Sequence, residues 1–258
     1  MRPGTRRKFS ATDLFAAFIL VICSSTHVCA EPSAANVLLG PPFPNQHRDE
    51  IAAKLRAITG WTDLRFDSQG RLRLGEREAT AGSSAARRLL SRAVTGSDQI
   101  VLEDASGQTD VVFCQVVSQM SHPRVSRASV VRVVRIDFAD FDQLLGDAIA
   151  RRAFDVAWGL LHELDHVVNR SADKDELGGP GKCESNINAM RRELGLPERA
   201  EYFYTRFPTN GHADFKSRFV RLAFDRQISP NKKKRYWILW DAALVGGLPE
   251  HTQVASVQ

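Results

Sequence analysis

Apolar residues recur at helical spacing in four segments of this chain. In the second segment, Ser83 or Ser84 stands where a helix needs a cap for its first turn, and Gly96 follows where the helix would end. The third segment is unusually long, and Gly146 marks a possible break within it. The predicted helices cover residues 48–58, 83–94, 141–169 and 184–194.

Between these helices the pattern changes to short β-rich runs. Residues 61–66 and 71–74 flank a turn and predict a small hairpin, and the next runs predict a strand meander directly before the long helix. A second hairpin is expected at the C-terminus, joined through residues 229–231. The order of strands, paired helices and hairpin predicts an α+β fold. The remaining predicted strands cover residues 99–102, 110–117, 129–138, 215–224 and 235–240.

Composition supports one compact domain after two N-terminal segments. The chain has 258 residues, of which 43% are hydrophobic and 25% charged, which suffices for one sizeable core. We predict a signal peptide in residues 1–30, a proline-rich lead-in in 31–47, and a single domain in 48–258. That domain divides into helices and strands in 48–140, the candidate functional helices in 141–205, and the hairpin region in 206–258.

The N-terminus has the features of an export signal. An uncharged apolar run, residues 14–23, follows a basic stretch, and residues 28–30 offer a small-residue cleavage site. The run is shorter than the roughly 20 residues that span a bilayer. Residues 5–9 also resemble a twin-arginine motif. We therefore expect a periplasmic or secreted protein that meets the membrane only through this signal, with an uncleaved anchor as the alternative.

Net charge does not point to a nucleic-acid partner. The chain carries +5, but residues 1–30 hold four basic residues against one acidic residue, so the remainder carries only +2. The basic run at residues 232–235 is expected to be a solvated turn. We expect no nucleic acid to bind.

The long helix contains His162-Glu163-Leu164-Asp165-His166, an HExxH motif. Side chains four residues apart lie on the same helical face, so the imidazoles of His162 and His166 can bind one Zn²⁺. Glu163 is rotated by about 100° from His162 and stands where a general base for a zinc-bound water is required. The pattern predicts a zinc-dependent hydrolase.

A catalytic zinc needs a third protein ligand. Glu184 is our main candidate, because it opens a second helix that can pack antiparallel to the first after a glycine-rich loop. Asp173 is the chief competitor, and Asp175 and Glu176 lie in the same loop. Asn188, one turn after Glu184, is expected to accept the free N–H of a ligand histidine.

These residues resemble a known family group. His162-Glu163-x-x-His166 with Glu184-x-x-x-Asn188 is similar to the gluzincin branch of the zincin metallopeptidases, although Asn188 replaces an acidic residue. The resemblance implies Glu184 as third ligand, and a zincin-like fold with a small mixed sheet packed on the active-site helix. Its edge strand would hold an extended peptide, and residues 130–136 are the candidate. Residues 188–202 also resemble some bacterial effector and toxin metallopeptidases.

We therefore expect an exported zinc metallopeptidase that hydrolyses peptide bonds of a protein or peptide, with Glu163 as general base and Zn²⁺ as cofactor. A toxin that acts on another cell's proteins would use the same chemistry. The alternative is a secreted, non-catalytic binding or assembly module with a structural metal. The candidates for stabilising the oxyanion are Tyr202, Tyr204, Arg206 and His212.

Three further expectations concern individual side chains. Cys114 and Cys183 remain after signal removal and either pair or stay as free thiols. Arg191 and Arg192 are expected on a solvated face, where they pair with Glu193 or Glu198. The four tryptophans are expected in the core or at its rim, and His47, His122 and His251 at the surface or in loops.

Overall fold

The structure is a computed structural model that describes residues 36–75, 79, 81–120, 130–174, 179–201, 203–206 and 218–245. All of them belong to one compact unit, Ser33–Gln258. The predicted export signal and the start of the proline-rich lead-in lie outside the described residues. Within the described part of the chain, no helix has the length and apolar character needed to cross a membrane.

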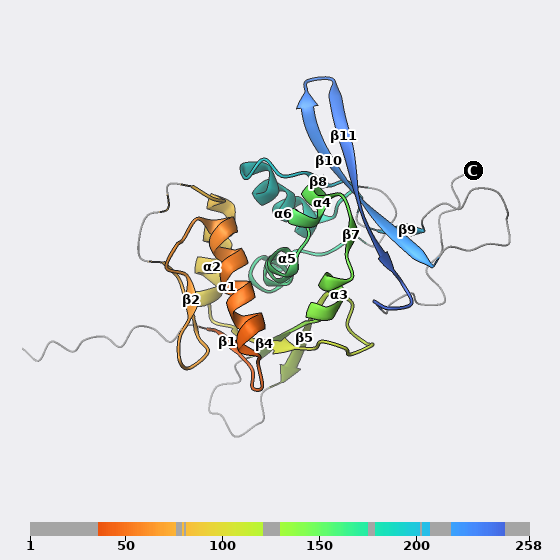
Figure 1. Ribbon diagram of the computed structural model, residues 1–258. Coiled ribbons are helices and arrows are strands. Elements are labelled where there is room, and N and C mark those ends of the chain that lie inside the picture. Colours follow the sequence, from red (N-terminus) through yellow and green to blue (C-terminus); the bar gives the residue numbers. More distant parts are fainter. Residues whose placement is uncertain are drawn as a thin grey trace, which may run out of the picture. The chain divides into compact units, whose positions relative to one another are not determined.

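The unit contains both helices and sheets, which confirms the α+β class (Figure 1). The helices are α1 (Asn45–Thr59), α2 (Ser84–Thr95), α3 (Phe138–Asp142), α4 (Ala148–Arg152), α5 (Val156–Asn169) and α6 (Lys182–Glu193). The strands are β1 (Val37–Leu39), β2 (Arg65–Phe66), β3 (Leu72–Arg73), β4 (Gln99–Asp104), β5 (Cys114–Met120), β6 (Val130–Ile136), β7 (Leu145–Gly146), β8 (Glu198–Arg199), β9 (Thr205–Arg206), β10 (Phe219–Ser229) and β11 (Lys232–Asp241).

The first sheet has the strand order β1-β4-β6-β5 and is mixed. Strands β1 and β6 run parallel to β4, whereas β5 runs antiparallel to β6. The predicted meander is therefore wrong, because β6 inserts between β4 and β5. The predicted edge strand is wrong for the same reason: residues 130–136 form the inner strand β6, and β5 is the edge.

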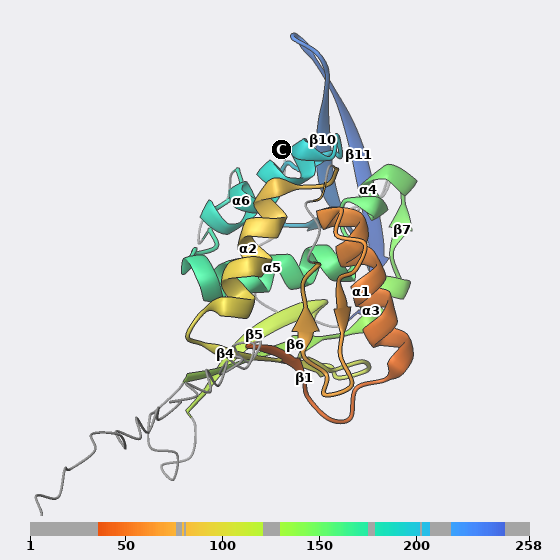
Figure 2. The same cartoon turned by 90° about the vertical axis from the view of Figure 1, so that its left-hand side faces the viewer.

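Helix α5 lies across this sheet, with α1, α2 and α6 packed around it (Figure 2). Its apolar side chains are almost completely buried, as the stripe of apolar positions in the sequence indicated. They join α1, α2, α6 and the sheet in one hydrophobic core, cluster 1. The helix is thus held on several sides and forms a rigid support for the residues that it carries.

The predicted break at Gly146 is confirmed, but a continuous helix over the rest of residues 141–169 is wrong: β7 separates α3 from α4, and residues 153–155 separate α4 from α5. Gly146 adopts φ +102° in β7, where a side-chain Cβ would lie 2.4 Å from the Trp237 carbonyl oxygen. β7 pairs with β11, which draws the chain away from a helical path. Asp155 then caps α5 by accepting hydrogen bonds from Ala157 and Trp158 N–H.

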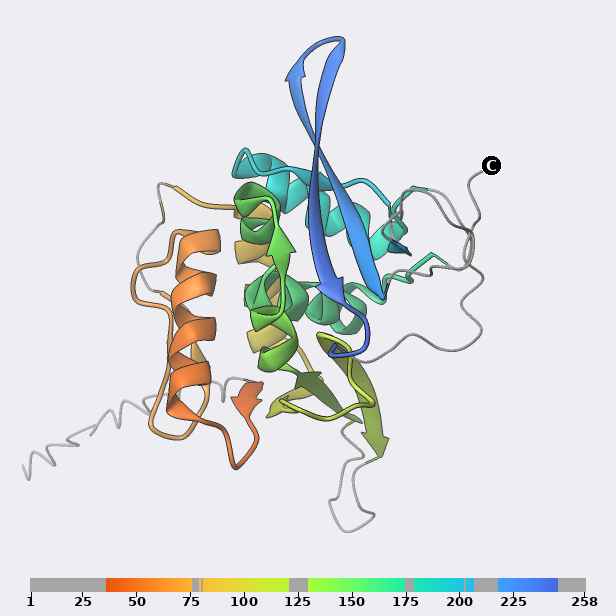
Figure 3. The same cartoon turned by 45° about the vertical axis from the view of Figure 1, so that its right-hand side comes forward.

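The C-terminal strands β10 and β11 form the expected hairpin (Figure 3). The basic run at residues 232–235 is exposed as predicted, but it forms the first residues of β11 and follows the turn itself. β7, β8 and β9 pair beside the hairpin, and together they cover a second hydrophobic core, cluster 2. Cluster 2 includes Phe113, Leu222, Phe224, Ile238 and Trp240.

Candidate metal centre

The two histidines of the HExxH motif present their Nε2 atoms to one carboxylate. His162 Nε2 lies 3.2 Å from Asp173 Oδ1, and His166 Nε2 lies 3.2 Å from Asp173 Oδ2. The ring centroids of the two histidines are 4.8 Å apart. The structure therefore brings together His162, His166 and Asp173, the chief competitor for the third position.

The end of α5 places Asp173 here. Arg170 adopts a left-handed conformation, φ +51°, and turns the chain back along the helix. The Ser171 carbonyl then accepts a hydrogen bond from His166 Nδ1 at 2.7 Å. A proton held on Nδ1 leaves Nε2 as the basic nitrogen, which faces Asp173.

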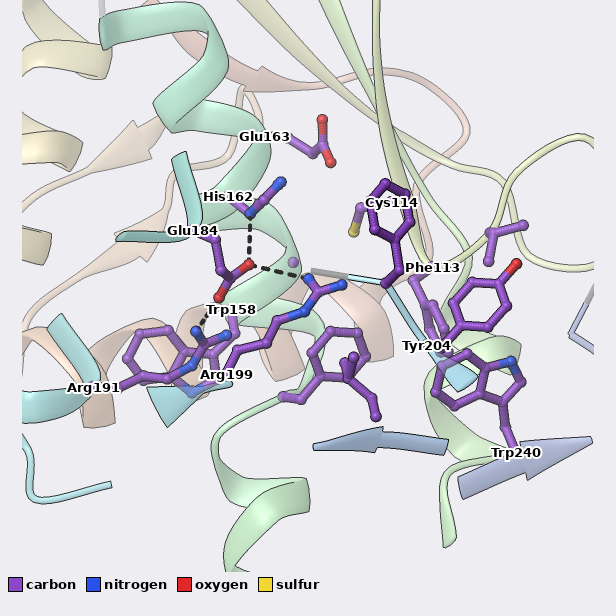
Figure 4. A pocket seen from close by; sticks show the side chains of 15 residues that line it. Phe113, Cys114, Trp158, His162, Glu163, Glu184, Arg191, Arg199, Tyr204 and Trp240 are labelled. Carbon is purple, nitrogen blue, oxygen red and sulfur yellow. Dashed lines mark hydrogen bonds and ion pairs between the residues drawn. The ribbon is translucent and has the colours of Figure 1, made fainter. Parts of the chain in front are cut away.

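Glu184 approaches His162 from the opposite edge of the ring. Its Oε2 lies 3.3 Å from His162 Nδ1 and 3.0 Å from Arg199 Nη1, and its Oε1 pairs with Arg191 (Figure 4). The carboxylate is 1% exposed. Burial alone would raise its pKa, but Arg191 and Arg199 hold the pKa well below the usual range. Glu184 is thus an ionised carboxylate that orients His162.

The role predicted for Asn188 is not what the structure shows. Its Oδ1 accepts hydrogen bonds from Arg191 and from the Arg199 backbone N–H, both at 2.8 Å, and its amide donates to the Arg199 carbonyl. Asn188 therefore anchors β8 to α6. The acceptors for the two histidine Nδ1 atoms are Glu184 and the Ser171 carbonyl.

Glu163 is buried beside the histidines and faces the edge strand. Its Oε2 accepts a hydrogen bond of 3.0 Å from the Val116 N–H of β5. Burial raises the pKa of Glu163, while the positive charges of His162 and His166 act in the opposite direction. A carboxyl group whose pKa is raised above its ordinary value takes up a proton more readily, which suits it to exchange a proton during a reaction.

Positive charge is favoured at the point where the imidazoles meet Asp173. The hydrogen bond to Asp173 is the main cause that raises the pKa of His166 to about 11. Burial lowers the pKa of His162, but Asp173, Cys183 and Glu184 outweigh burial and leave that pKa well above its ordinary value. The same electrostatic preference would favour a cation.

Two thiols lie near the centre, and both are free. Cys183 is fully buried, and its Sγ donates to the His162 carbonyl at 3.4 Å. Its sulfur and the ligand atoms of His162, His166 and Asp173 all lie within 4.8 Å of one another. Burial raises the pKa of the Cys114 thiol well above its ordinary value, so Cys114 is not suited to act as a nucleophile.

Two cavities meet at His162 and Glu163. One has a volume of about 600 Å³ and follows β5 past Gln115 and Ser118 to Asp173. The other has a volume of about 400 Å³ and extends toward the hairpin (Figure 4). A substrate group at the histidines would therefore have room on both sides.

Of the candidates for oxyanion stabilisation, Tyr204 lines the smaller cavity. Arg206 is in β9, and its side chain lies outside the described residues, as do Tyr202 and His212. The loop acids Asp175 and Glu176 also lie outside them, like His122 and His251.

The arginines of α6 behave differently from each other. Arg192 pairs with Glu198 at 2.6 Å on the surface, as predicted. The prediction for Arg191 is wrong: the side chain is 2% exposed, pairs with Glu184, and lies over the rings of Trp158 and Phe224. Arg191 follows Glu184 by two helical turns, so their shared face was the available signal for this pair.

Two of the tryptophans expected in the core also contribute to the site. Trp158 and Trp240 are core residues, as expected, but they also line the smaller cavity together with Phe113. His47, expected at the surface or in a loop, is instead a partly buried residue of α1 that pairs with Asp104 at 2.6 Å and stacks on Phe138.

No family model, curated protein or solved structure matches this chain.

Proposed function

We propose that this protein is a zinc-dependent metallopeptidase with a zincin-like arrangement. The observation that carries the proposal is the convergence of two histidine Nε2 atoms on one carboxylate, with a buried Glu163 alongside. A helix with the HExxH motif lying on a mixed sheet, beside an antiparallel edge strand, supports the fold assignment. Asp173, rather than Glu184, would then be the third ligand.

The donor set fits zinc. Two imidazole nitrogens and one carboxylate oxygen are ligands that zinc accepts, and three protein ligands leave a position for water. Zinc in such a site acts as a Lewis acid toward the scissile carbonyl and makes water more acidic. Glu184 and the Ser171 carbonyl orient the ligands, because each accepts from a histidine Nδ1.

Glu163 would carry the proton. Its carboxylate would accept a proton from water as the water oxygen forms a bond to the scissile carbonyl carbon. When the C–N bond then breaks, Glu163 would pass this proton to the leaving amine. The Val116 N–H holds one oxygen of Glu163 and so sets the direction of the other. The raised pKa of Glu163 suits both transfers, since the group must gain and lose a proton in each cycle.

Strand β5 would hold the peptide. In the described residues it pairs only with β6, and backbone groups along a strand point alternately to its two sides. The Val116 N–H points away from β6 to Glu163, so Ser118 presents its backbone to the same open edge. An extended substrate can add to this edge as a further strand and pass directly in front of Glu163.

The test is a Glu163→Gln variant loaded with one zinc per chain. We expect peptide cleavage to fall by at least about a hundredfold, because the amide cannot accept the proton. Glu198→Gln, a change of the same kind on the surface, is the control and should cleave normally. A Glu163→Gln protein that holds zinc and cleaves as fast as the parent would refute the proposal.

Cys183 favours a second candidate, a structural metal site in a non-catalytic protein. If its thiolate joined His162, His166 and Asp173, four protein ligands would close the coordination sphere. A Cys183→Ser variant distinguishes the two functions. The peptidase should keep its zinc and activity, whereas a structural site should lose zinc affinity and free energy of unfolding together.

We also propose that the protein is exported with residues 1–30 removed, on the basis of the apolar run and cleavage site of the N-terminal segment. Mass spectrometry of the protein recovered outside the bacterial cytoplasm should give a mature N-terminus at or near Glu31. Recovery of the intact N-terminus in the membrane fraction would support the uncleaved anchor.

A further inference from the structure

The smaller cavity opens directly at the proposed reaction centre. His162 and Glu163 line one part of it, and the cavity continues away from Asp173 toward the C-terminal hairpin. Figure 4 shows His162 and Glu163 on one side of this space and Tyr204 and Trp240 on the other. Its volume of about 400 Å³ lies within the range of about 300–1,000 Å³ that is typical of ligand pockets.

The part of the cavity farthest from the histidines is aromatic. The Phe113 ring lies 5.2 Å from both the Phe154 and Trp240 rings, and the Tyr204 ring lies 5.3 Å from Trp240. These rings come from the segment before β5, the turn before α5, the segment before β9, and β11. The fold thus gathers them from separate parts of the chain into one apolar wall.

The charged part of the cavity is unfavourable for a basic side chain. Two carboxylates line the cavity: Glu184 is already shared by Arg191, Arg199 and His162, and Glu163 accepts from the Val116 N–H and is the proposed base. The Arg199 guanidinium carbon lies 5.9 Å from the Phe154 ring centre, so a positive charge already faces the aromatic wall. A lysine or arginine of the substrate would lose water here beside another cation.

We propose that this cavity is a specificity pocket for a large aromatic or aliphatic side chain, on one of the two residues that flank the scissile bond. The inference rests on the proposed peptidase function, because that function puts the scissile bond at His162 and Glu163. It adds the substrate class: peptides with a bulky uncharged residue at the cleavage site, and not peptides with a basic one.

The first experiment uses the zinc-loaded protein and a library of internally quenched peptides. After cleavage sites are located by mass spectrometry, matched peptides carry Phe, Leu, Ala or Lys at the flanking position. Burial of a Phe or Leu side chain should raise kcat/KM by about ten- to a hundredfold over Ala. Lys should be the poorest of the four.

Tyr204→Ala removes one ring of the wall and should reduce the preference for Phe over Ala by about tenfold. Tyr236→Ala is the matched control, because Tyr236 is also partly buried against cluster 2 but does not line the cavity. Tyr236→Ala should keep the preference for Phe over Ala. Tyr204→Phe retains the ring and should also keep this preference. If Tyr204→Ala does not fold, Tyr204→Phe is used in its place. In that case, loss of the preference in Tyr204→Phe would contradict a pocket that recognises the apolar ring.

The second experiment needs no cleavage. Saturation-transfer NMR measures binding of 3-phenylpropanamide and of propanamide to the protein, to Tyr204→Ala and to Tyr236→Ala. The phenyl probe should bind the parent and Tyr236→Ala at least tenfold more tightly than propanamide, and Tyr204→Ala should lose this difference. Selective binding without cleavage of any peptide would refute the peptidase function and support the pocket. Equal binding of both probes, or cleavage with no preference for a bulky residue, would overturn the pocket.

Discussion

At the scale of single residues, His162 lies between two carboxylates, those of Asp173 and Glu184. The residues around each carboxylate indicate different roles for the two. Glu184 is 1% exposed and forms ion pairs with two arginines, so its carboxylate is buried and its charge is already neutralised. Asp173 lies in a loop and faces the Nε2 atoms of both histidines. A third ligand would have to reach an ion held by the two Nε2 atoms, and Asp173 is the carboxylate of the two that faces them.

Metal affinity should separate these roles. Asp173→Ala is expected to lower zinc affinity by at least about a hundredfold, because it removes the proposed third ligand. Glu184→Gln should lower it by about ten- to a hundredfold, because it weakens the group that orients His162. Competition with a fluorescent chelator measures both. If Asp173→Ala keeps normal affinity while Glu184→Gln loses the metal, Glu184 is the ligand.

Asp140 is a second residue to consider at this scale, because its ionisation should change the stability of the fold. It is 5% exposed, and its Oδ2 accepts the N–H of Phe113, which holds a strained φ of +61°. Burial raises the pKa of Asp140 to about 6, with a further contribution from Asp137 and an opposing one from the Phe113 N–H. Because the folded protein binds this proton more tightly than the unfolded chain, Asp140 stabilises the fold at low pH. That contribution is lost as pH rises from about 4 through 6.

Asp140→Asn should therefore raise the free energy of unfolding at pH 8 by about 1–3 kcal/mol, while the effect vanishes below pH 4. The amide oxygen can still accept the Phe113 N–H. Urea unfolding at several pH values measures the effect. Asp142→Asn, at an exposed position of the same helix, should change stability by less than about 0.5 kcal/mol at any pH. Equal pH profiles for parent and Asp140→Asn would contradict the assignment.

At the scale of elements, contacts between the start of α2 and the end of α6 hold these two helices together. The N-terminus of α2 is capped by Ser83 and also by Glu193 from the last turn of α6. The Glu193 carboxylate accepts from both Ser83 and Ser84 hydroxyls and from the Ala85 N–H. A carboxylate at a helix N-terminus is favoured by the helix dipole as well as by these bonds.

Glu193→Ala should lower the free energy of unfolding by about 1 kcal/mol, since it removes this second cap. Glu198→Ala, which breaks the exposed pair with Arg192, should cost less, within about 0.5 kcal/mol. Thermal and urea unfolding of both variants give the comparison. A Glu193→Ala protein as stable as Glu198→Ala would show that the contact between α2 and α6 contributes nothing.

At the scale of the whole molecule, the two hydrophobic clusters are joined beside the candidate site. Phe141 and Leu196 pack against both of them. Arg191 lies 5.2 Å from the Trp158 ring of cluster 1 and 5.6 Å from the Phe224 ring of cluster 2. Because the linking residues are shared, neither cluster can open without disturbing the other.

Hydrogen exchange should show this coupling. The slowest amides of α5, in cluster 1, and of β10 and β11, in cluster 2, should exchange with free energies of opening that agree within about 1 kcal/mol. Mass spectrometry under native conditions can compare these segments. If the hairpin amides opened several kcal/mol below those of α5, the clusters would be independent units.

The local pattern was sufficient for most elements and for part of the site. Helix α2 begins at the predicted Ser83 cap, and the C-terminal hairpin turns where expected, because caps and turns depend on neighbouring residues. The spacing of His162 and His166 likewise placed both imidazoles on one face. These features are short-range, so the amino-acid sequence by itself determined them.

Most of the features that differ from expectation depend on distant residues. Residues 143–147 leave the helix because β7 pairs with β11, and β6 becomes an inner strand because β4 lies beside it. Asp173 faces the Nε2 atoms of both histidines, whereas Glu184 lies at the Nδ1 edge of His162, where it pairs with Arg191 and Arg199. Strand order and charge pairing are long-range effects, and only the tertiary structure decided them.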